Sequence, residues 1–471
     1  MNKYCILAGM AFSLLFPALS RGQEVGLLRL NPNDRKSEGE VTLWGGVEEG
    51  RFRPVDAALF QWTAGAQARA VRHGKKVSWT GALSFEQTAG KHQESSLFLE
   101  PGYFPMDIVE GSARFVSRQT VRLEGGFLRD FAYEWAAGLK ASFKGANQVK
   151  RANDRLSALG MEIQLEPLVT YVLDDDAGFV TSYLVQLRTE RISMKPSADA
   201  AAQSYLFLDK GMRYGAYEDG LGAFPVLEFA HGFNGQYYSP EFAAGGGITW
   251  KRGRAGDNAF NRFRFPGSTL MVFVDRTFEG FEVDHVYGAS YERQRDQLRE
   301  LIPGSENAGY QSLSDRVGRN LGLKYEVRLH DSFLKSAGID LDGNQWTERS
   351  VLSHPTMDRI RWYNGTATLH SSMVFGVFGM DLNLLAGNGW WKDRGLTGPE
   401  EQNGRLTDNW NKKMEYYLVS HVGVGGTLSF RVPAVKGLSF QLYGCWHRAF
   451  RVIYLRGKNR EIARLQVDYR F

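Results

Sequence analysis

The carboxyl-terminal stretch IARLQVDYRF, residues 462–471, decides the fold class. From Ala463 onward every second residue is apolar, up to Phe471 at the end, and the residues between them are Arg, Gln, Asp and Arg. Successive side chains of a β-strand point to opposite faces. The stretch therefore predicts a strand with one wholly apolar face and one charged face.

The same alternation recurs upstream in long runs. Residues 161–173, 321–330 and 413–431 place apolar side chains at alternate positions, with mostly polar or charged side chains between them. A strand of a globular protein has about 5 or 6 residues, whereas a tilted strand that crosses a bilayer needs about 9 to 11. Long strands with one apolar face predict an all-β, transmembrane antiparallel barrel.

The charged faces of these runs are too polar for a dry core. In the run 321–330, four ionisable side chains follow one another on the same face. We therefore expect the apolar faces to meet lipid and the charged faces to line a wet lumen. The lumen-lining side chains expected from this argument are Lys324, Glu326, Arg328, His330, Glu415 and His421.

The amino terminus has the pattern of an export signal. Lys3 gives a short positive region, the stretch 5–19 is apolar, and small residues follow at the spacing of a cleavage site. We expect residues 1–22 to be a cleaved signal peptide, residues 23–40 a short periplasmic segment and residues 41–471 the barrel. An uncleaved anchor is the alternative. Beyond residue 22 no stretch of about 18 apolar residues follows, so no transmembrane helix is expected.

The final strand also carries a resemblance. Its apolar residues Leu465, Val467, Tyr469 and Phe471 resemble the signal that the barrel-assembly machinery reads in outer-membrane proteins. The resemblance implies a bacterial outer-membrane location, contact with outer-membrane lipid and the assembly machinery as a partner during biogenesis. The chain as a whole resembles the uncharacterised outer-membrane barrels of Gram-negative bacteria. A soluble protein that ends in an edge strand is the alternative.

Counting the alternating runs predicts 14 to 18 strands, with 16 as the central value, because bacterial barrels of one chain have even strand numbers. One candidate strand begins near Ser204. Long outer loops are expected over residues 91–111, 332–356 and 391–412. The segment 291–310 would fall on the periplasmic side although it is long, which indicates either a short charged helix or a miscounted strand.

The segment before the barrel bears on the fold as well. About 35 residues separate the signal from the first secure strand, near Leu59. The globular plug of a TonB-dependent receptor is several times longer, so no plug domain is expected.

Composition and motifs limit the chemistry. The net charge of +5 is too small to indicate nucleic acid. The mature chain keeps one cysteine, Cys445, which we expect to be shielded. Asp340, Asp342 and Asn344, with Glu348, alternate in an expected outer loop, a spacing of oxygen ligands that suits calcium. A polar turn without metal is the alternative.

One further acidic cluster lies between two expected strands. Residues 174–176 are three consecutive aspartates, followed by Ala177 and Gly178. A metal or catalytic cluster would use such carboxylates. The position between two strands instead favours a tight turn.

Three functions are compatible with a barrel of this size. A channel or transporter for small polar solutes is favoured, because about 16 strands leave an aqueous lumen unless a loop fills it. A non-catalytic barrel that docks another outer-membrane protein is the second, with the apolar side chains of loop 91–111 as the docking surface. Those side chains are Phe98, Tyr103, Phe104 and Met106. A lipid- or peptide-hydrolysing enzyme is the third, but no serine pairs with a histidine in sequence, so no catalytic residue is expected.

Overall fold

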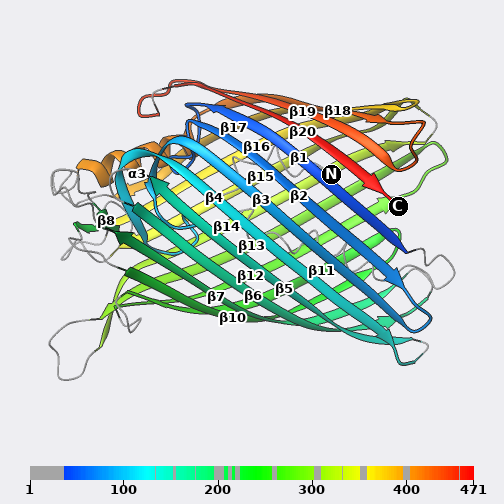
Figure 1. Cartoon of the computed structure of the whole chain (residues 1–471), viewed down its shortest axis with the longest axis horizontal. Helices are drawn as coiled ribbons and strands as arrows, with labels where there is room; N and C mark the ends of the chain where they lie inside the picture. Colours follow the sequence, from blue (N-terminus) through cyan, green and yellow to red (C-terminus); the bar gives the residue numbers. More distant parts are fainter. Residues whose placement is uncertain are drawn as a thin grey trace.

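The computed structural model describes residues 37–132, 134–151, 155–174, 177–195, 206–210, 215–217, 223–256, 262–301, 309–330, 332–350, 358–395, 404–455 and 457–471. Twenty strands form one antiparallel sheet in this part of the chain. Two of them make a small side hairpin on β4, and the other 18 close into a barrel (Figure 1).

The strands of the first half vary most in length. They are β1 (Glu38–Gly50), β2 (Phe60–His73), β3 (Val77–Ser96), β4 (Asp107–Asp130), β5 (Trp135–Arg151), β6 (Arg155–Val172), β7 (Gly178–Lys195), the side hairpin β8 (Leu206–Asp209) and β9 (Gly215–Tyr217), and β10 (Ala223–Tyr238).

The second half continues the meander and contains one described helix. Its elements are β11 (Phe242–Ala255), β12 (Phe263–Phe278), β13 (Val283–Leu301), β14 (Tyr310–Leu329), β15 (Leu334–Ser350), β16 (Asp358–Phe375), β17 (Phe378–Gly395), α3 (Gly404–Leu418), β18 (His421–Arg431), β19 (Leu438–Ala449) and β20 (Asn459–Arg470).

The barrel closes between its first and last strands. β1 and β20 pair antiparallel over 11 residue pairs, from Glu40 with Arg470 to Gly50 with Arg460. Beyond this ladder the backbones of Gly39 and Phe471 exchange two hydrogen bonds, each 3.0 Å long. The carboxyl-terminal strand therefore supplies the closing ladder.

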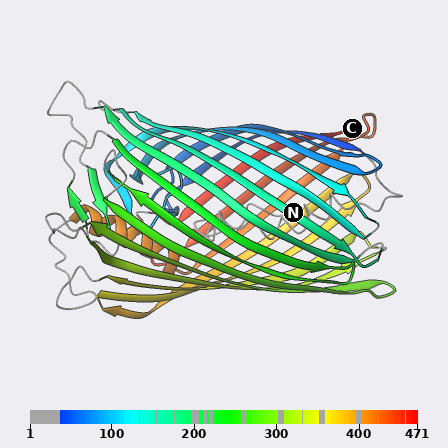
Figure 2. The ribbon, with the colours of Figure 1, turned by 90° about the horizontal axis from the view of Figure 1, so that it is seen from below.

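The connections differ sharply between the two ends. At the end where the chain terminates they are short, and the turn after β16 contains only Gly376 and Val377. Gly376 has a φ of +63° there, a left-handed conformation that glycine adopts without strain. The opposite end carries the long loops and α3 (Figure 2). This asymmetry is typical of outer-membrane barrels, with short turns in the periplasm.

The outer surface is apolar along the middle of the strands. Leu321 and Leu323 on β14, for example, are 51% and 45% exposed to the surroundings of the chain. Exposed large apolar side chains recur on β1 to β20, which is the surface that hydrocarbon requires. None of the helices in the described ranges is long and apolar enough to cross a membrane.

The strand number of 18 lies at the upper bound of the prediction, and the central value of 16 is wrong. The candidate strand near Ser204 is only the short β8, whereas β15 was missed and treated as a loop. The extra strand reversed the parity downstream, so the chain passes from β13 to β14 on the outer side. Residues 291–301 of the segment 291–310 are the second half of β13, and Tyr310 begins β14. The miscounted strand, rather than a helix, explains that anomaly. The plug prediction concerns residues 1–36, which lie outside the described ranges.

The predicted strand 413–431 is wrong in its first third. Residues 404–418 form α3, and the strand begins only at His421. Met414, Tyr416 and Leu418 mimic a strand because they alternate, but Leu406, Trp410 and Met414 repeat every four residues, as one side of a helix does.

Candidate functional site

The connection between β3 and β4 folds into the barrel. We call residues 97–106 the inner loop. Its apolar side chains are each 2–4% exposed and form one dry cluster with inward-facing residues of β5 to β14. Phe104 contacts the ring of Phe265 on β12 edge-on, with centroids 5.4 Å apart. The apolar members of the inner loop are Leu97, Phe98, Leu99, Phe104 and Met106.

Glu100 fastens the inner loop to the barrel wall. Its carboxylate accepts a hydrogen bond from Lys144 on β5 and lies 2.8 Å from Nη2 of Arg188 on β7. Burial alone would raise the pKa of this carboxyl. The charges of Arg188 and Lys144 outweigh burial and lower the pKa to about 2, so Glu100 is ionised at neutral pH.

Tyr103 lies at the centre of a second set of charges. Its hydroxyl donates to Glu228 on β10, and the Arg188 guanidinium carbon lies 3.9 Å from the ring centroid. Lys251 on β11 lies 5.0 Å from the same centroid and pairs with Asp296 on β13 at 2.7 Å. Burial, followed by the negative charge of Glu228, raises the pKa of Tyr103 well above its usual value. The phenol therefore stays a donor.

The backbone of the inner loop is also held. The amide of Leu99 donates to Oε1 of Glu190 on β7 at 2.6 Å. Arg316 on β14 donates to the carbonyl oxygen of Phe104 at 3.2 Å and pairs with Glu348 on β15 at 3.1 Å. Five barrel strands, β5, β7, β10, β11 and β14, thus contact the inner loop through polar groups. The inner loop therefore closes this end of the barrel.

The helix α3 fills the other side of the same end. Trp410 and Met414 pack with Ile360 and Trp362 on β16 in a second buried cluster. The Glu415 carboxylate accepts hydrogen bonds from the amides of residues 453–455 in the β19–β20 loop, two of them at 2.7 Å. Glu415 was predicted to line the lumen from a strand, and the structure instead places it on α3 as an anchor for a loop.

The wall nearer the periplasm carries charged side chains. Lys324 and Arg328 on β14 both pair with Glu326, at 2.8 Å and 3.1 Å. The side chains of Lys324 and Arg328 are 42% and 48% exposed, whereas Glu326 between them is 12% exposed. The three side chains share one inner face of β14, so this part of the wall offers both signs of charge.

The two predicted histidines occupy different environments. His330 follows the last residue of β14, and its Nε2 lies 2.8 Å from Oδ2 of Asp284 in the periplasmic turn region. His421 faces inward at the start of β18, but it is 6% exposed and its ring lies 5.4 Å from that of Phe52. Neither histidine therefore stands free in the wet part of the lumen.

The candidate calcium ligands are not in a loop. Asp340, Asp342 and Asn344 lie on the inner face of β15, where Asp340 is opposite Lys324 and Asn344 is opposite Asn320. Nδ1 of His370 on β16 lies 3.4 Å from Asp340. The loop position that suggested calcium is wrong. Among the described residues no three His, Cys, Asp or Glu side chains gather closely enough to hold a metal ion.

Asp174, the described member of the three aspartates at 174–176, lies in a turn, as predicted. The chain reverses between β6 and β7 at this point, and the amide of Ala177 donates to Oδ1 of Asp174 at 2.7 Å. Asp175 and Asp176 lie outside the described residues.

The docking surface predicted on loop 91–111 is wrong in its residues. Phe98, Phe104 and Met106 are each 2% exposed and point into the barrel, so they offer no surface to a partner. The sequence signal for inward folding is present but weak: apolar residues are interrupted by Glu100 and by two prolines at 101 and 105. A partner protein remains a prediction without an assigned surface.

One pair of reactive side chains was not anticipated. Sγ of Cys445 and Nε2 of His447, two residues apart on the inner face of β19, lie 2.9 Å from each other. Both residues are buried, at 7% and 8% exposure. Cys445 is thus shielded, as predicted, and the pair is not accessible to a solute in the wet part of the lumen.

The four residues that resemble an assembly signal lie on the outer face of β20. Leu465, Tyr469 and Phe471 are 53%, 42% and 71% exposed, and the rings of Tyr469 and Phe471 lie 5.9 Å apart. Val467 lies between them on the same face, opposite Leu43 of β1. The apolar row predicted from the sequence is therefore the lipid-facing side of β20.

A family model matches residues 27–471, almost the whole chain, and is described as a family of unknown function, DUF6850. The chain belongs to this family. No curated protein matches it.

The chain is similar to several solved structures. FpvA of Pseudomonas aeruginosa, in complexes with heterologous pyoverdines, superposes with a TM-score of 0.51 at 9% identity, over 93% of this chain and 72% of FpvA. BauA, the ferric preacinetobactin receptor from Acinetobacter baumannii, gives 0.44 at 8% identity, over 92% and 80% of the two chains. OccAB2 of the same species gives 0.37 at 10% identity, over 93% and 98%. The DUF6850 chain is a bacterial outer-membrane β-barrel, closed by 18 strands with an apolar belt.

Proposed function

We propose that this DUF6850 protein is a gated outer-membrane transport protein for small polar solutes, with the inner loop as its gate. The observation that carries the proposal is the buried ionic attachment of the inner loop through Glu100, Arg188 and Lys144. A loop that only filled the outer end of the barrel could be held by apolar contacts alone and would not need these buried charges. A solute that competes for these ion pairs would weaken the attachment of the inner loop.

The charged inner wall supports the same proposal. Below the inner loop, solvated side chains of both signs line the barrel, such as Lys324 and Glu326 on β14. A wall of this kind stabilises polar solutes and not apolar ones. The likeness to FpvA concerns the fold alone, and the solute of this chain is not inferred from it.

A disulfide that ties the inner loop to the wall tests the proposal. A β-carbon built on Gly160 of β6 would lie 3.8 Å from Cγ of Leu99, so cysteines at these two positions would face each other. The variant carries Leu99→Cys and Gly160→Cys in a Cys445→Ser background. Its two single-cysteine parents are the controls.

The readouts are conductance in planar bilayers and sugar or amino-acid uptake by proteoliposomes. We expect the oxidised double variant to conduct and take up solute less than the same protein after reduction, and the parents to be unaffected by reduction. Equal transport in both redox states would overturn the gate. If no solute or ion crosses in any state, the transport proposal itself fails.

A further inference from the structure

Arginines gather on the outer surface of the barrel, where β13 to β16 approach their outer ends. They surround a hollow of about 250 Å³, and Asp315 is the one carboxylate among the residues that line it. Figure 1 places these strands side by side on the barrel wall. We call the following side chains the arginine cluster: Arg293, Arg295, Arg319, Arg349 and Arg361.

The cluster lies at the level of the outer lipid head groups. In the same register row as Arg319 of the cluster, the aromatic rings of Tyr363 on β16 and Trp390 on β17 stack with centroids 5.7 Å apart. Each lies 12 residues along its strand from an exposed phenylalanine at the periplasmic rim, Phe375 or Phe378. At about 3.3 Å per residue and a tilt of about 40°, this separation is roughly 30 Å, the thickness of a hydrocarbon core.

The positive charge of the cluster is only partly neutralised. Arg295 pairs with Asp315 through two contacts, of 3.0 Å and 3.1 Å. Arg319 donates to the amide oxygen of Gln345 at 2.9 Å, which leaves its charge uncompensated. Arginines with spare N–H groups bind phosphate oxygens in pairs, which an ammonium group does less well.

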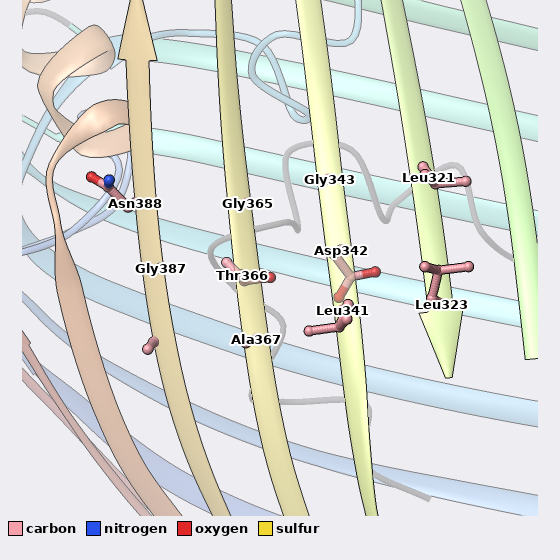
Figure 3. Close-up of a pocket in the computed structure, with 11 residues that line it drawn as sticks. Leu321, Leu323, Leu341, Asp342, Gly343, Gly365, Thr366, Ala367, Gly387 and Asn388 are labelled. Carbon is pink, nitrogen blue, oxygen red and sulfur yellow. The ribbon is translucent and has the colours of Figure 1, made fainter. Parts of the chain in front are cut away.

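A shallow groove continues from the cluster into the hydrocarbon region. It has a volume of about 500 Å³, and its floor lacks large apolar side chains because β15 to β17 present mostly glycine and alanine there (Figure 3). Leu321, Leu323 and Leu341 border it. The arginine cluster and the groove are continuous in the sheet. Arg319 is opposite Gln345, and the next pair of lipid-facing residues on the same two strands is Leu321 with Gly343. The floor consists of Gly343, Gly365, Ala367 and Ala386.

We infer that this face binds a phosphorylated, acylated glycolipid of the outer leaflet. Its phosphates contact the arginine cluster, and one acyl chain lies in the groove below. Charge complementarity selects the anionic head group, and the depth of the groove selects a chain that enters the hydrocarbon layer. The inference is independent of the proposed transport function, because the site is on the opposite side of the wall from the lumen.

Native mass spectrometry of the full-length protein in detergent, titrated with purified lipid A, tests this site. The main variant combines Arg293→Gln, Arg319→Gln and Arg361→Gln. A matched control replaces two exposed cations near the outer ends of other strands, Lys91→Gln and Arg448→Gln. We expect binding about 100-fold weaker in the main variant, since each cation near an anionic membrane contributes a few-fold, and unchanged binding in the control.

Two further experiments distinguish the contribution of the lipid phosphates from that of the acyl chain. Dephosphorylated lipid A should bind the wild-type protein as weakly as lipid A binds the triple variant, and Arg→Lys replacements at the three positions should restore part of the affinity. Gly343→Leu with Gly365→Leu fills the groove and should weaken binding while the arginines remain. Equal binding of phosphorylated and dephosphorylated lipid, or a partner protein on this face that excludes lipid, would overturn the inference.

Discussion

Glu100 of the inner loop lies 2.8 Å from Arg188 of β7, measured between Oε2 and Nη2, and the two side chains are only 7% and 8% exposed. Removal of one partner from such a buried pair leaves a charge without compensation. The pair therefore couples the position of the inner loop to the charge on a single carboxyl group.

Glu100→Gln should release the inner loop. The amide keeps the size of the side chain but leaves Arg188 and Lys144 without their carboxylate, which costs about 3 kcal/mol of docking free energy. We expect a higher open probability in single-channel recordings. Glu124→Gln on β4 is the control, because its pair with Arg122 spans 3.9 Å and is exposed. Identical recordings for wild type and Glu100→Gln would contradict the role of the pair.

Acid should release the same contact. The pKa of Glu100 is lowered to about 2 by docking, from 4.5 for the free side chain. A lowered pKa means that the stabilisation is complete above pH 4.5 and is lost as the pH falls toward 2. Docking should weaken by up to roughly 3 kcal/mol over this window. Conductance measured from pH 7 to pH 2.5 should rise in the wild type but not in Glu100→Gln, and a flat wild-type profile would argue against the assignment.

Deletion of Phe471 should impair assembly more than stability. The deletion removes the two backbone hydrogen bonds with Gly39 and the last aromatic residue of the outward row on β20. We expect several-fold less folded protein in outer-membrane fractions, measured as the heat-modifiable band on gels. Lys436→Gln, in an exposed periplasmic turn, is the control. Normal amounts of folded protein after the deletion would exclude an assembly role for this residue.

Gly437→Ala should destabilise the turn between β18 and β19. Gly437 has a φ of +88°, and an added β-carbon would collide with the carbonyl oxygen of Arg470. We expect a loss of about 1–3 kcal/mol in urea unfolding in lipid vesicles. Gly444→Ala on β19 is matched to it, because an added β-carbon there meets no atom within 4 Å. Equal losses for both variants would mean that the turn conformation is not responsible.

Glu415→Gln should loosen the β19–β20 loop. The carboxylate accepts three amide hydrogen bonds from residues 453–455, and bonds to a charged acceptor each contribute about 1.5–3 kcal/mol. We expect faster tryptic cleavage after Arg451. Asp408→Asn on the same helix, an exposed partner of Lys412, should leave cleavage unchanged. An unaltered rate in Glu415→Gln would show that the loop is held by other contacts.

The alternation of side chains predicted the fold class because a barrel strand has the same two faces along its whole length. The run 321–330 illustrates this: each of its strand residues has the orientation that the sequence indicated. β15 was missed because its outer half, with Asn344, Gln345 and Thr347, is polar on both faces where the strand rises above the bilayer. The number of strands is therefore harder to predict from the sequence than the fold class.

The candidate site was less predictable because it depends on long-range contacts. Glu100 and Arg188 are 88 positions apart, and neither belongs to a local motif that indicates an ion pair. The inner loop was instead interpreted as an outer surface, since exposed and inward-folded apolar loops have the same composition. Its direction is set by charged side chains on five strands, which one sequence does not reveal.

The ladder between β1 and β20 makes the backbone a ring with a single covalent gap. In a meander of this kind every strand has two sequential neighbours except at the gap, where hydrogen bonds replace the peptide link. A circular permutant that joins residue 471 to residue 37 through a short linker and begins at the turn after β16 would preserve every strand pair. It would also move the seam away from IARLQVDYRF, and so separate what this stretch contributes as a structural element from what it contributes as a terminus.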